Sequence, residues 1–299
     1  MADDLDILRD LLLRHAHGRR TLTAIPRVRL VRAEAPTELI PMVYDPALCL
    51  VLQGAKRVLI GDQVIRYGTG MHFISTIETP ALGSIAEASG DAPYLSISIA
   101  FDPAIIAAIL LDMPAQAELP LQRAFAAEAA GAQMIEAWRR LVELIDRPEE
   151  IAVLGPARER EILYRLLQGP QGALLRQIAG ADGRLVQIRQ AVAWLRENYA
   201  APLRVEDLAR RVGMSVTVFH RHFKAVTALP PIQYQKRLRL YEARRRLVER
   251  PGDAAGAAFA VGYESASQFS REYARLFGAP PARDVARLRR SSEDALTPV

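Results

Sequence analysis

The sequence predicts an α+β protein of two domains, a small β-barrel with accompanying helices followed by an all-helical domain that contains a repeated unit. Short β-rich runs alternate with turn residues from about residue 25 to 101, whereas the chain beyond residue 183 has helical patterns throughout. The net charge changes sign between the two regions, and a helical segment with a glycine turn occurs twice in the second. A chain of 299 residues is long enough for two such domains.

The N-terminal region begins with a predicted helix at residues 5–16, where Leu5, Leu8, Leu12 and Leu13 recur at helical spacing. The β-rich runs that follow are VRLV, LCLVLQG, KRVLIG, QVIRYG, HFIST and YLSISIAF. Gly61-Asp62 between two of these runs predicts a hairpin. Many short strands at close spacing favour a small barrel or sandwich over a parallel sheet.

Helical patterns return between residues 103 and 179. Pro103 stands where a proline is tolerated in the first turn of a helix, ahead of the run AIIAAILL. The segments MIEAWRRLVELI, AREREILYRLLQG and GALLRQIA follow, and the first two end at prolines or glycines. The glycine-bearing stretch at 180–184 is expected to be a linker between a domain at 1–179 and a domain at 186–290.

Charge separates the two predicted domains. Residues 1–182 carry 18 basic and 23 acidic side chains and residues 183–299 carry 21 and 11, which gives net charges of −5 and +10. A compact basic domain is typical of proteins that bind a polyanion, although a basic face can also serve solubility alone.

Several classes of protein are excluded by simple observations. The acidic N-terminus has no secretion signal pattern, and no run of 18 apolar residues could span a membrane. The single cysteine, Cys49, excludes an internal disulfide and a cysteine-based zinc cluster. We therefore expect a cytoplasmic protein with no membrane partner.

The repeated unit reads VGMSVTVFHRHFKAVTALPP at 212–231 and VGYESASQFSREYARLFGAPP at 261–281. In each copy a glycine permits a tight turn and a serine (Ser215 or Ser265) is suited to cap the next helix. A short helix, a glycine turn and a second helix with polar side chains near its start are typical of a helix-turn-helix. Helix packing alone could produce one such pattern, but two copies in a basic domain favour DNA binding.

These residues resemble a known family. The pattern LARRVGMSVTVFHRHFK, RLRLYEARRRL and VGYESASQFSREYARLFGAPP is similar to the DNA-binding domain of the AraC/XylS family of bacterial transcription regulators, over about residues 186–290. The stretches LCLVLQGAKRVLIGD and APYLSISIAFD resemble the cupin-like sensing domain of a subfamily. The resemblance implies binding to double-stranded DNA, control by a small-molecule effector and RNA polymerase as a further partner. A homodimer, formed through helices between about 103 and 179, is also expected.

The family pattern implies which side chains contact DNA in the two units, at about 204–226 and 253–277. In the first unit, base contacts fall on Thr217, His220 and Arg221, and Lys224 contacts phosphate. In the second unit, the corresponding residues are Ala266, Ser267, Ser270 and Arg271.

Three positions depart from the family pattern. Arg204 stands where a Ser or Thr usually caps the first helix, and Ala228 replaces a glycine that would adopt a left-handed conformation without strain. Gly256 lies inside a predicted helix, where it costs about 1 kcal/mol relative to alanine.

The segment that connects the two units is predicted to be one long helix from residue 232 to about 250. Leu238, Ala243 and Leu247 face inward, with basic side chains around them, namely Lys236, Arg237, Arg239 and Arg244–Arg246. Nineteen helical residues span about 29 Å, close to the ~34 Å turn of B-DNA. The two recognition helices could therefore enter consecutive major grooves.

Enzymatic alternatives have weaker support. His72 is the only histidine in the barrel segment, which favours a packed or hydrogen-bonded residue over a metal ligand. Cys49 lies between two leucines with no cation beside it in the sequence, which favours an inert thiol over a methyl or redox acceptor. Tyr44, His72, Phe73 and Tyr94 are candidates for an effector pocket, although aromatic residues in a barrel also form the core.

The favoured interpretation is a regulator that is not an enzyme and has no cofactor or metal. The alternatives are a cupin-type metal or thiol enzyme fused to a DNA-binding domain, and a general DNA-packaging protein.

Overall fold

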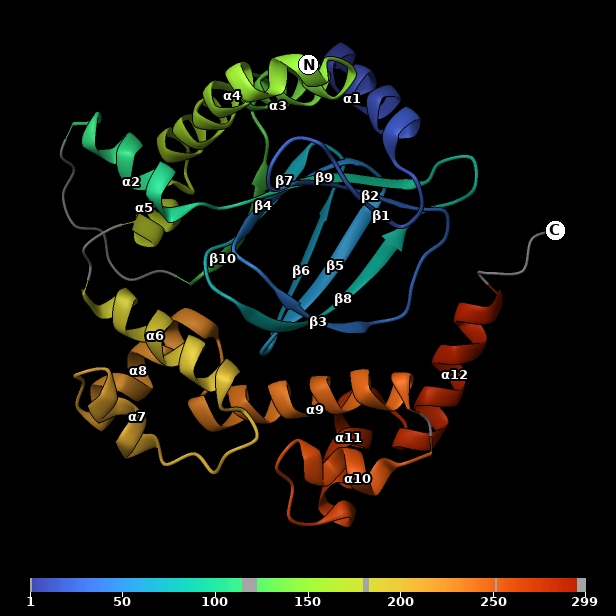
Figure 1. Cartoon of the computed structure of the whole chain (residues 1–299), viewed down its shortest axis with the longest axis vertical. Coiled ribbons are helices and arrows are strands. Elements are labelled where there is room, and N and C mark those ends of the chain that lie inside the picture. Colours follow the sequence, from blue (N-terminus) through green and yellow to red (C-terminus); the bar gives the residue numbers. More distant parts are fainter. Residues whose placement is uncertain (1, 115–122, 180–182, 251, 295–299) are drawn as a thin grey trace. The chain divides into compact units, whose positions relative to one another are not determined.

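The computed structural model describes residues 2–114, 123–179, 183–250 and 252–294, and Figure 1 shows the whole chain. The chain divides into two compact units, Met1–Arg189 with Arg221–Ala228, and Gln190–His220 with Leu229–Val299. The division passes through helix α8 (Val216–Thr227). Residues 180–182 of the expected linker lie outside the described residues.

Ten strands within the described ranges form two antiparallel sheets in the first unit. The six-stranded sheet has the order β1-β2-β9-β4-β7-β10, and the four-stranded sheet has the order β3-β8-β5-β6. The strands are β1 (Arg20–Leu22), β2 (Val28–Ala33), β3 (Ile40–Tyr44), β4 (Ala47–Gln53), β5 (Ala55–Ile60), β6 (Gln63–Gly68), β7 (Met71–Ser75), β8 (Thr79–Glu87), β9 (Tyr94–Ala100) and β10 (Phe125–Ala129).

The six β-rich runs of the sequence are confirmed as β2, β4, β5, β6, β7 and β9, and the predicted hairpin joins β5 to β6. Gly61 in its turn has a φ of 63°. Strand β8 is not among the β-rich runs predicted from the sequence, and it contains Pro80. Pro80 is tolerated because it pairs only with β3, whereas β8 begins to pair with β5 at Leu82.

Two cores lie on the two faces of the six-stranded sheet. Leu48, Leu50, Ile74 and other residues of one face pack against helices, whereas Val51 and residues of the other face pack against the four-stranded sheet. The helices on the first face are α1 (Ala2–His15), α2 (Pro103–Leu111), α3 (Ala132–Val142), the 3₁₀ turn Glu143–Asp146, α4 (Pro148–Gln168) and α5 (Gly172–Ala179). The two described sheets do not close into one barrel, but their arrangement is compatible with a cupin-like jelly roll.

The N-terminal helices match the expected patterns with one correction. In α1, Leu8, Leu11 and Leu12 are buried, whereas Leu13, which was expected to face inward, is 41 % exposed. Pro103 occupies the first turn of α2, and Asp102 caps that helix by accepting a hydrogen bond from the Ala104 N–H at 2.9 Å.

The second unit is helical, as predicted. Its elements are α6 (Gly183–Glu197), which begins in the first unit, α7 (Val205–Arg211), the start of α8, α9 (Pro231–Glu249), α10 (Ala254–Ala260), α11 (Ala266–Phe277) and α12 (Pro281–Asp294). Helix α9 runs from α6 and α7 to the group formed by α10, α11 and α12 (Figure 1). Within the described ranges no helix combines the length and apolar character needed to cross a membrane.

Candidate nucleic-acid interface and ligand cavity

The first helix-turn-helix forms where the sequence predicts it. Helix α7 buries Val205, Leu208 and Ala209, and Gly213 follows in the turn with a φ of 70°. The Met214 N–H donates to the Ala209 carbonyl at 2.9 Å and closes the turn. Arg204 stands at the N-cap of α7 without a side-chain capping bond, as its identity predicts.

Helix α8 separates apolar and polar side chains as expected. Phe219 and Phe223 are fully buried. The four candidate DNA contacts of this helix are all exposed, namely Thr217, His220, Arg221 and Lys224. Ala228 follows the helix with a φ of 60°, which confirms the strained left-handed conformation expected there.

The second helix-turn-helix repeats the geometry of the first. Gly262 has a φ of 88°, and the Tyr263 N–H donates to the Ala258 carbonyl at 3.0 Å, as Met214 does to Ala209. Ser265 caps α11 by accepting from the Gln268 N–H at 3.3 Å, which confirms its predicted role.

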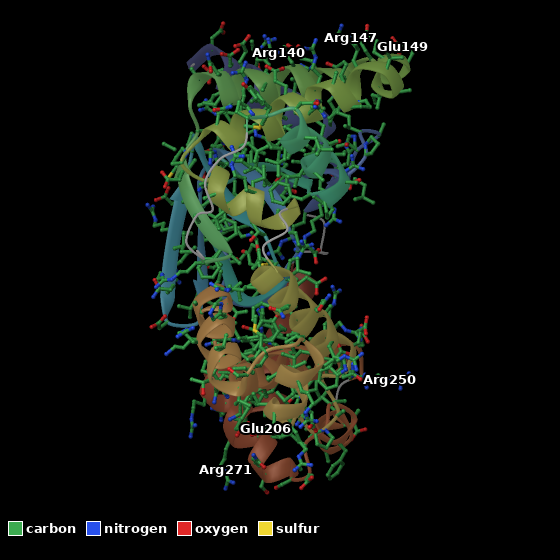
Figure 2. The ribbon with its side chains drawn as sticks, turned by 90° about the vertical axis from the view of Figure 1, so that its left-hand side faces the viewer. Arg140, Arg147, Glu149, Glu206, Arg250 and Arg271 are labelled. Atoms are coloured by element: carbon green, nitrogen blue, oxygen red, sulfur yellow. The ribbon has the colours of Figure 1, made fainter. Side chains whose placement is uncertain are left out.

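The candidate contacts on α11 differ in exposure. Ser267 and Arg271 are exposed, whereas Ala266 and Ser270 are partly buried. Figure 2 shows that Arg271 extends away from the ribbon. Gln268, an exposed amide on the first turn of α11, is a further candidate contact that was not predicted from the sequence. Its position three residues after the capping serine could have identified it.

Gly256 in α10 has a capping role that the sequence did not predict. The Asp253 side chain caps this helix by accepting from the Gly256 N–H at 2.7 Å. A Cβ at position 256 would collide with that carboxylate. Glycine therefore permits the cap, and the expected gain from alanine is offset by the loss of this hydrogen bond.

Two of the arginines of α9 have structural roles within the second unit. Arg239 donates to backbone carbonyls of the second unit, including Tyr199 at 2.6 Å. Arg244 is buried and donates to both carboxylate oxygens of the buried Asp284, at 2.6 and 2.9 Å. Burial would raise the pKa of Asp284, but hydrogen bonds from Arg244 and Tyr273 and the charge of Arg244 lower it overall.

A cavity of about 200 Å³ lies between the two sheets of the first unit. Tyr44, Phe73 and Tyr94, three of the four candidate effector residues, line it. His72 does not, because strand alternation turns it to the other face of β7. There it is buried, close to Gln171 and Glu128, and burial lowers its pKa.

Sequence reasoning missed several residues of the cavity. The missed polar ones include Arg29, Lys56, Tyr67, Ser96 and Ser98. Period-2 alternation with Val58 and Ile60 could have placed Lys56 on the inner face of its strand. The sequence alone does not indicate which strands face each other across the cavity.

Cys49 also lines the cavity, where its surroundings differ from those expected from the sequence. A cation is nearby after all, because the charge of Lys56 acts to lower the pKa of the thiol. Burial is the larger effect and raises the pKa of Cys49 overall, so the thiol is neutral and not activated. In the described part of the chain, no group of three His, Cys, Asp or Glu side chains is placed to hold a metal ion.

Comparisons with known proteins agree with this geometry. The family model for the AraC-type transcriptional regulator N-terminus matches residues 24–174, half of the chain, and a helix-turn-helix domain model matches residues 208–287. A curated relative, the HTH-type transcriptional activator RhaS of Pectobacterium carotovorum, is 33 % identical over 156 residues, which are 51 % of this chain and 54 % of RhaS. The chain thus spans about half the length of the curated relatives it matches.

Solved structures share the fold at low sequence identity. ToxT from Vibrio cholerae strain SCE256, with bound unsaturated fatty acid, aligns with a TM-score of 0.54 at 9 % identity, covering 90 % of this chain and 95 % of ToxT. ToxT from Vibrio cholerae O395, bound to (E)-4-(8-methylnaphthalen-1-yl)but-3-enoic acid, gives a TM-score of 0.55 at 9 % identity, covering 86 % and 98 %. At this level of identity the likeness concerns the fold alone.

Proposed function

Because this chain belongs to the AraC family of transcriptional regulators, we propose that it binds specific DNA sequences through its two helix-turn-helix units and responds to a small molecule in its first unit. The observation that carries the proposal is the repeated turn geometry, with an exposed arginine, Arg221 or Arg271, on each following helix. Both side chains are exposed, and neither forms an ion pair with a described carboxylate; the Arg221 guanidinium lies 3.4 Å from the Nε2 of His222.

The proposed DNA contacts are those of the two recognition helices. Thr217, His220 and Arg221 read bases in one half-site, and Ser267, Ser270 and Arg271 read bases in the other, beside Ala266. Lys224 contacts phosphate. An arginine can donate two hydrogen bonds to guanine, whereas a lysine on phosphate adds affinity without sequence preference. Helix α9 has nineteen residues and spans about 29 Å, which suits two adjacent major grooves.

The proposed sensor is the cavity between the two sheets. Its lining combines aromatic walls with convergent polar groups, a combination typical of small-molecule sites. ToxT structures with a bound fatty acid and a bound naphthalenyl butenoic acid support ligand binding by a protein of this fold. We place the sensor domain at 1–179 and the DNA-binding domain at 186–290.

The remaining parts of the proposal follow from the family. The protein acts in the cytoplasm as a homodimer, without catalysis and without a metal, and RNA polymerase is a further partner. The rival catalyst needs an activated thiol or a metal cluster. The raised pKa of Cys49 and the position of His72 outside the cavity both favour the regulator.

The test is selection from a pool of random DNA duplexes by the full chain. The proposal predicts enrichment of one site with two half-sites about 10 base pairs apart, centre to centre. A DNA-packaging protein would retain the duplexes without enriching any sequence, and that result would refute the regulator. A chelator in a parallel selection serves as the control for the metal-dependent alternative.

A further inference from the structure

The inner face of the six-stranded sheet is unusually polar. Arg29, Ser98 and Cys49 lie in register across β2, β9 and β4, and all three line the cavity. The residues that alternate with them along each strand, such as Leu48 and Ile97, point to the other face and are buried against the helices. In an ordinary sandwich both inner faces are apolar, so the polar row indicates a surface built for a ligand.

The facing sheet adds a cation. Lys56 of β5 lies in register between Tyr67 of β6 and Ile85 of β8. Its Nζ is 4.9 Å from the centre of the Tyr44 ring. In the described ranges Lys56 forms no ion pair, and Asp45, which is exposed, is the only carboxylate among the residues that line the cavity. The cavity therefore carries a positive charge without a buried counter-charge.

Three phenol groups supply neutral donors. The hydroxyls of Tyr44, Tyr67 and Tyr94 are buried and form no well-aligned hydrogen bond with a described side chain, although Tyr67 lies close to Tyr44, and Tyr94 lies close to Ser96 and Cys49. Tyr67 and Tyr94 are each only 1 % exposed. Burial raises the pKa of both phenols well above the usual value, so both keep their protons and can donate to an anion.

Apolar surface surrounds these polar groups. The Tyr67 and Phe73 rings are stacked with centroids 5.0 Å apart, and Tyr44 meets Phe73 edge-on at 5.5 Å. Met42 and Ile85 also line the cavity. Gly83 lies beneath this wall, where an added Cβ would come within 2.8 Å of the Tyr44 hydroxyl. The site thus offers an apolar enclosure with one charged end.

We propose that this cavity binds a small organic carboxylate, with the carboxylate at Lys56 and the Tyr44, Tyr67 and Tyr94 hydroxyls, and its apolar body against Phe73. The inference rests on the proposed sensor role of the first unit and specifies the ligand class. An amine would meet the like charges of Lys56 and Arg29. A neutral ligand would leave the Lys56 charge unpaired on the inner face, which is unfavourable.

The experiment uses Cys49, the only cysteine of the chain, as a reporter of occupancy in the full-length protein. The rate of its modification by iodoacetamide, a small neutral reagent, is measured with increasing benzoate or hexanoate. Benzamide and hexanamide are the neutral counterparts of these probes. The acids should slow modification at concentrations at least about tenfold lower than the amides, because the charged contact contributes about a factor of ten or more.

Matched variants of one strand test the role of the cation. Lys56→Met keeps most of the side-chain volume and removes the charge, whereas Arg57→Met removes the same charge from the exposed neighbour. Lys56→Met should abolish the preference for acids over amides, and Arg57→Met should retain it. Tyr67→Phe should weaken acid protection severalfold and serves as the second variant if Lys56→Met does not fold.

The outcomes separate the ligand class from the sensor role. If the amides protect Cys49 as well as the acids, and Lys56→Met changes nothing, the carboxylate proposal is wrong while the cavity remains a sensor for neutral molecules. If no probe protects Cys49 at millimolar concentration, the carboxylate proposal is also wrong. Neither result affects the enrichment of a DNA site, which tests the regulator itself.

Discussion

The guanidinium group of Arg239, at the middle of α9, donates a hydrogen bond of 2.8 Å to the carbonyl of Gly262, the turn glycine of the second helix-turn-helix. The same group donates to Tyr199 and Ala201, at 2.6 and 2.9 Å, in the loop that precedes α7. One side chain therefore connects the approach to the first helix-turn-helix with the turn of the second. Burial lowers the pKa of Arg239, although an arginine remains charged.

We predict that Arg239→Met weakens binding to a site with both half-sites about 10- to 100-fold, because carbonyls in two segments lose their shared donor. It should also broaden the preferred spacing between half-sites. Arg239→Lys should bind this site little better than Arg239→Met, because an ammonium group lacks the planar array of donors of a guanidinium. The measurement is binding to duplexes whose half-sites are shifted by one or two base pairs. Arg245→Met, on the exposed face of the same helix, is the control, and an unchanged spacing preference in Arg239→Met would contradict the prediction.

Loss of either arginine, Arg221 or Arg271, should alter base preference and not simply lower affinity for all sequences. Arg221→Ala and Arg271→Ala should each relax base preference in one half-site only, at a cost of about 1–3 kcal/mol of discrimination. The first helix-turn-helix has the longer side chains Thr217 and His220 beside its arginine and should define its half-site more sharply. Binding to a randomised library at fixed salt measures both effects. A uniform loss of affinity with intact base preference would assign that arginine to a phosphate contact.

Lys224→Ala should lower affinity for all sequences alike. Each phosphate contact that is lost reduces the salt dependence of binding, by about one unit in the slope of log K against log salt. The test compares binding at two salt concentrations for specific and unrelated duplexes. A changed base preference would show that Lys224 reads bases.

The buried Arg244–Asp284 pair should make the stability of the second unit sensitive to acid. Asp284 has a lowered pKa when folded, so its contribution is present above the ordinary carboxylate pKa of about 4 and is lost as pH falls through the lower folded value. Asp284→Asn should cost about 3–5 kcal/mol near pH 7, because it leaves Arg244 buried without its counter-charge. Denaturant unfolding of both proteins should show this difference shrinking below about pH 4. A difference that is constant with pH would show that the ion pair is not the cause.

A dimer is predicted through the helical segment of the first unit. On α4, Val153 is 76 % exposed and Tyr164 is 46 % exposed, and such apolar surface is suited to a symmetric contact. Sedimentation at micromolar concentration should show a dimer for the wild type and a shift to monomer for Val153→Glu. The charge-matched control is Thr69→Glu, at an exposed position of the first unit. A wild-type monomer across this range would refute the prediction.

The repeated helix-turn-helix was predictable because its determinants are local. A glycine with positive φ, a capping serine and a stripe of apolar residues at helical spacing each act within one or two turns of helix. The structure accordingly places Gly213, Gly262, Ser265 and Phe219 as the sequence indicates. Six of the strands were predictable for the same reason, because alternation and turn residues are properties of short segments.

By itself, then, the sequence determined the order of the two domains and the two helices that follow the glycine turns, with the exposed Arg221 and Arg271 on them. The cavity and the arginine contacts were decided only by the tertiary structure. Most neighbouring strands are not consecutive in the chain: β4 lies between β9 and β7, and β8 lies between β3 and β5. Periodicity indicates which face of a strand is buried, but the pairing of strands decides which side chains meet there. Lys56 therefore shares a cavity with Cys49, and Arg239 contacts Gly262, through packing between distant segments that no local pattern encodes.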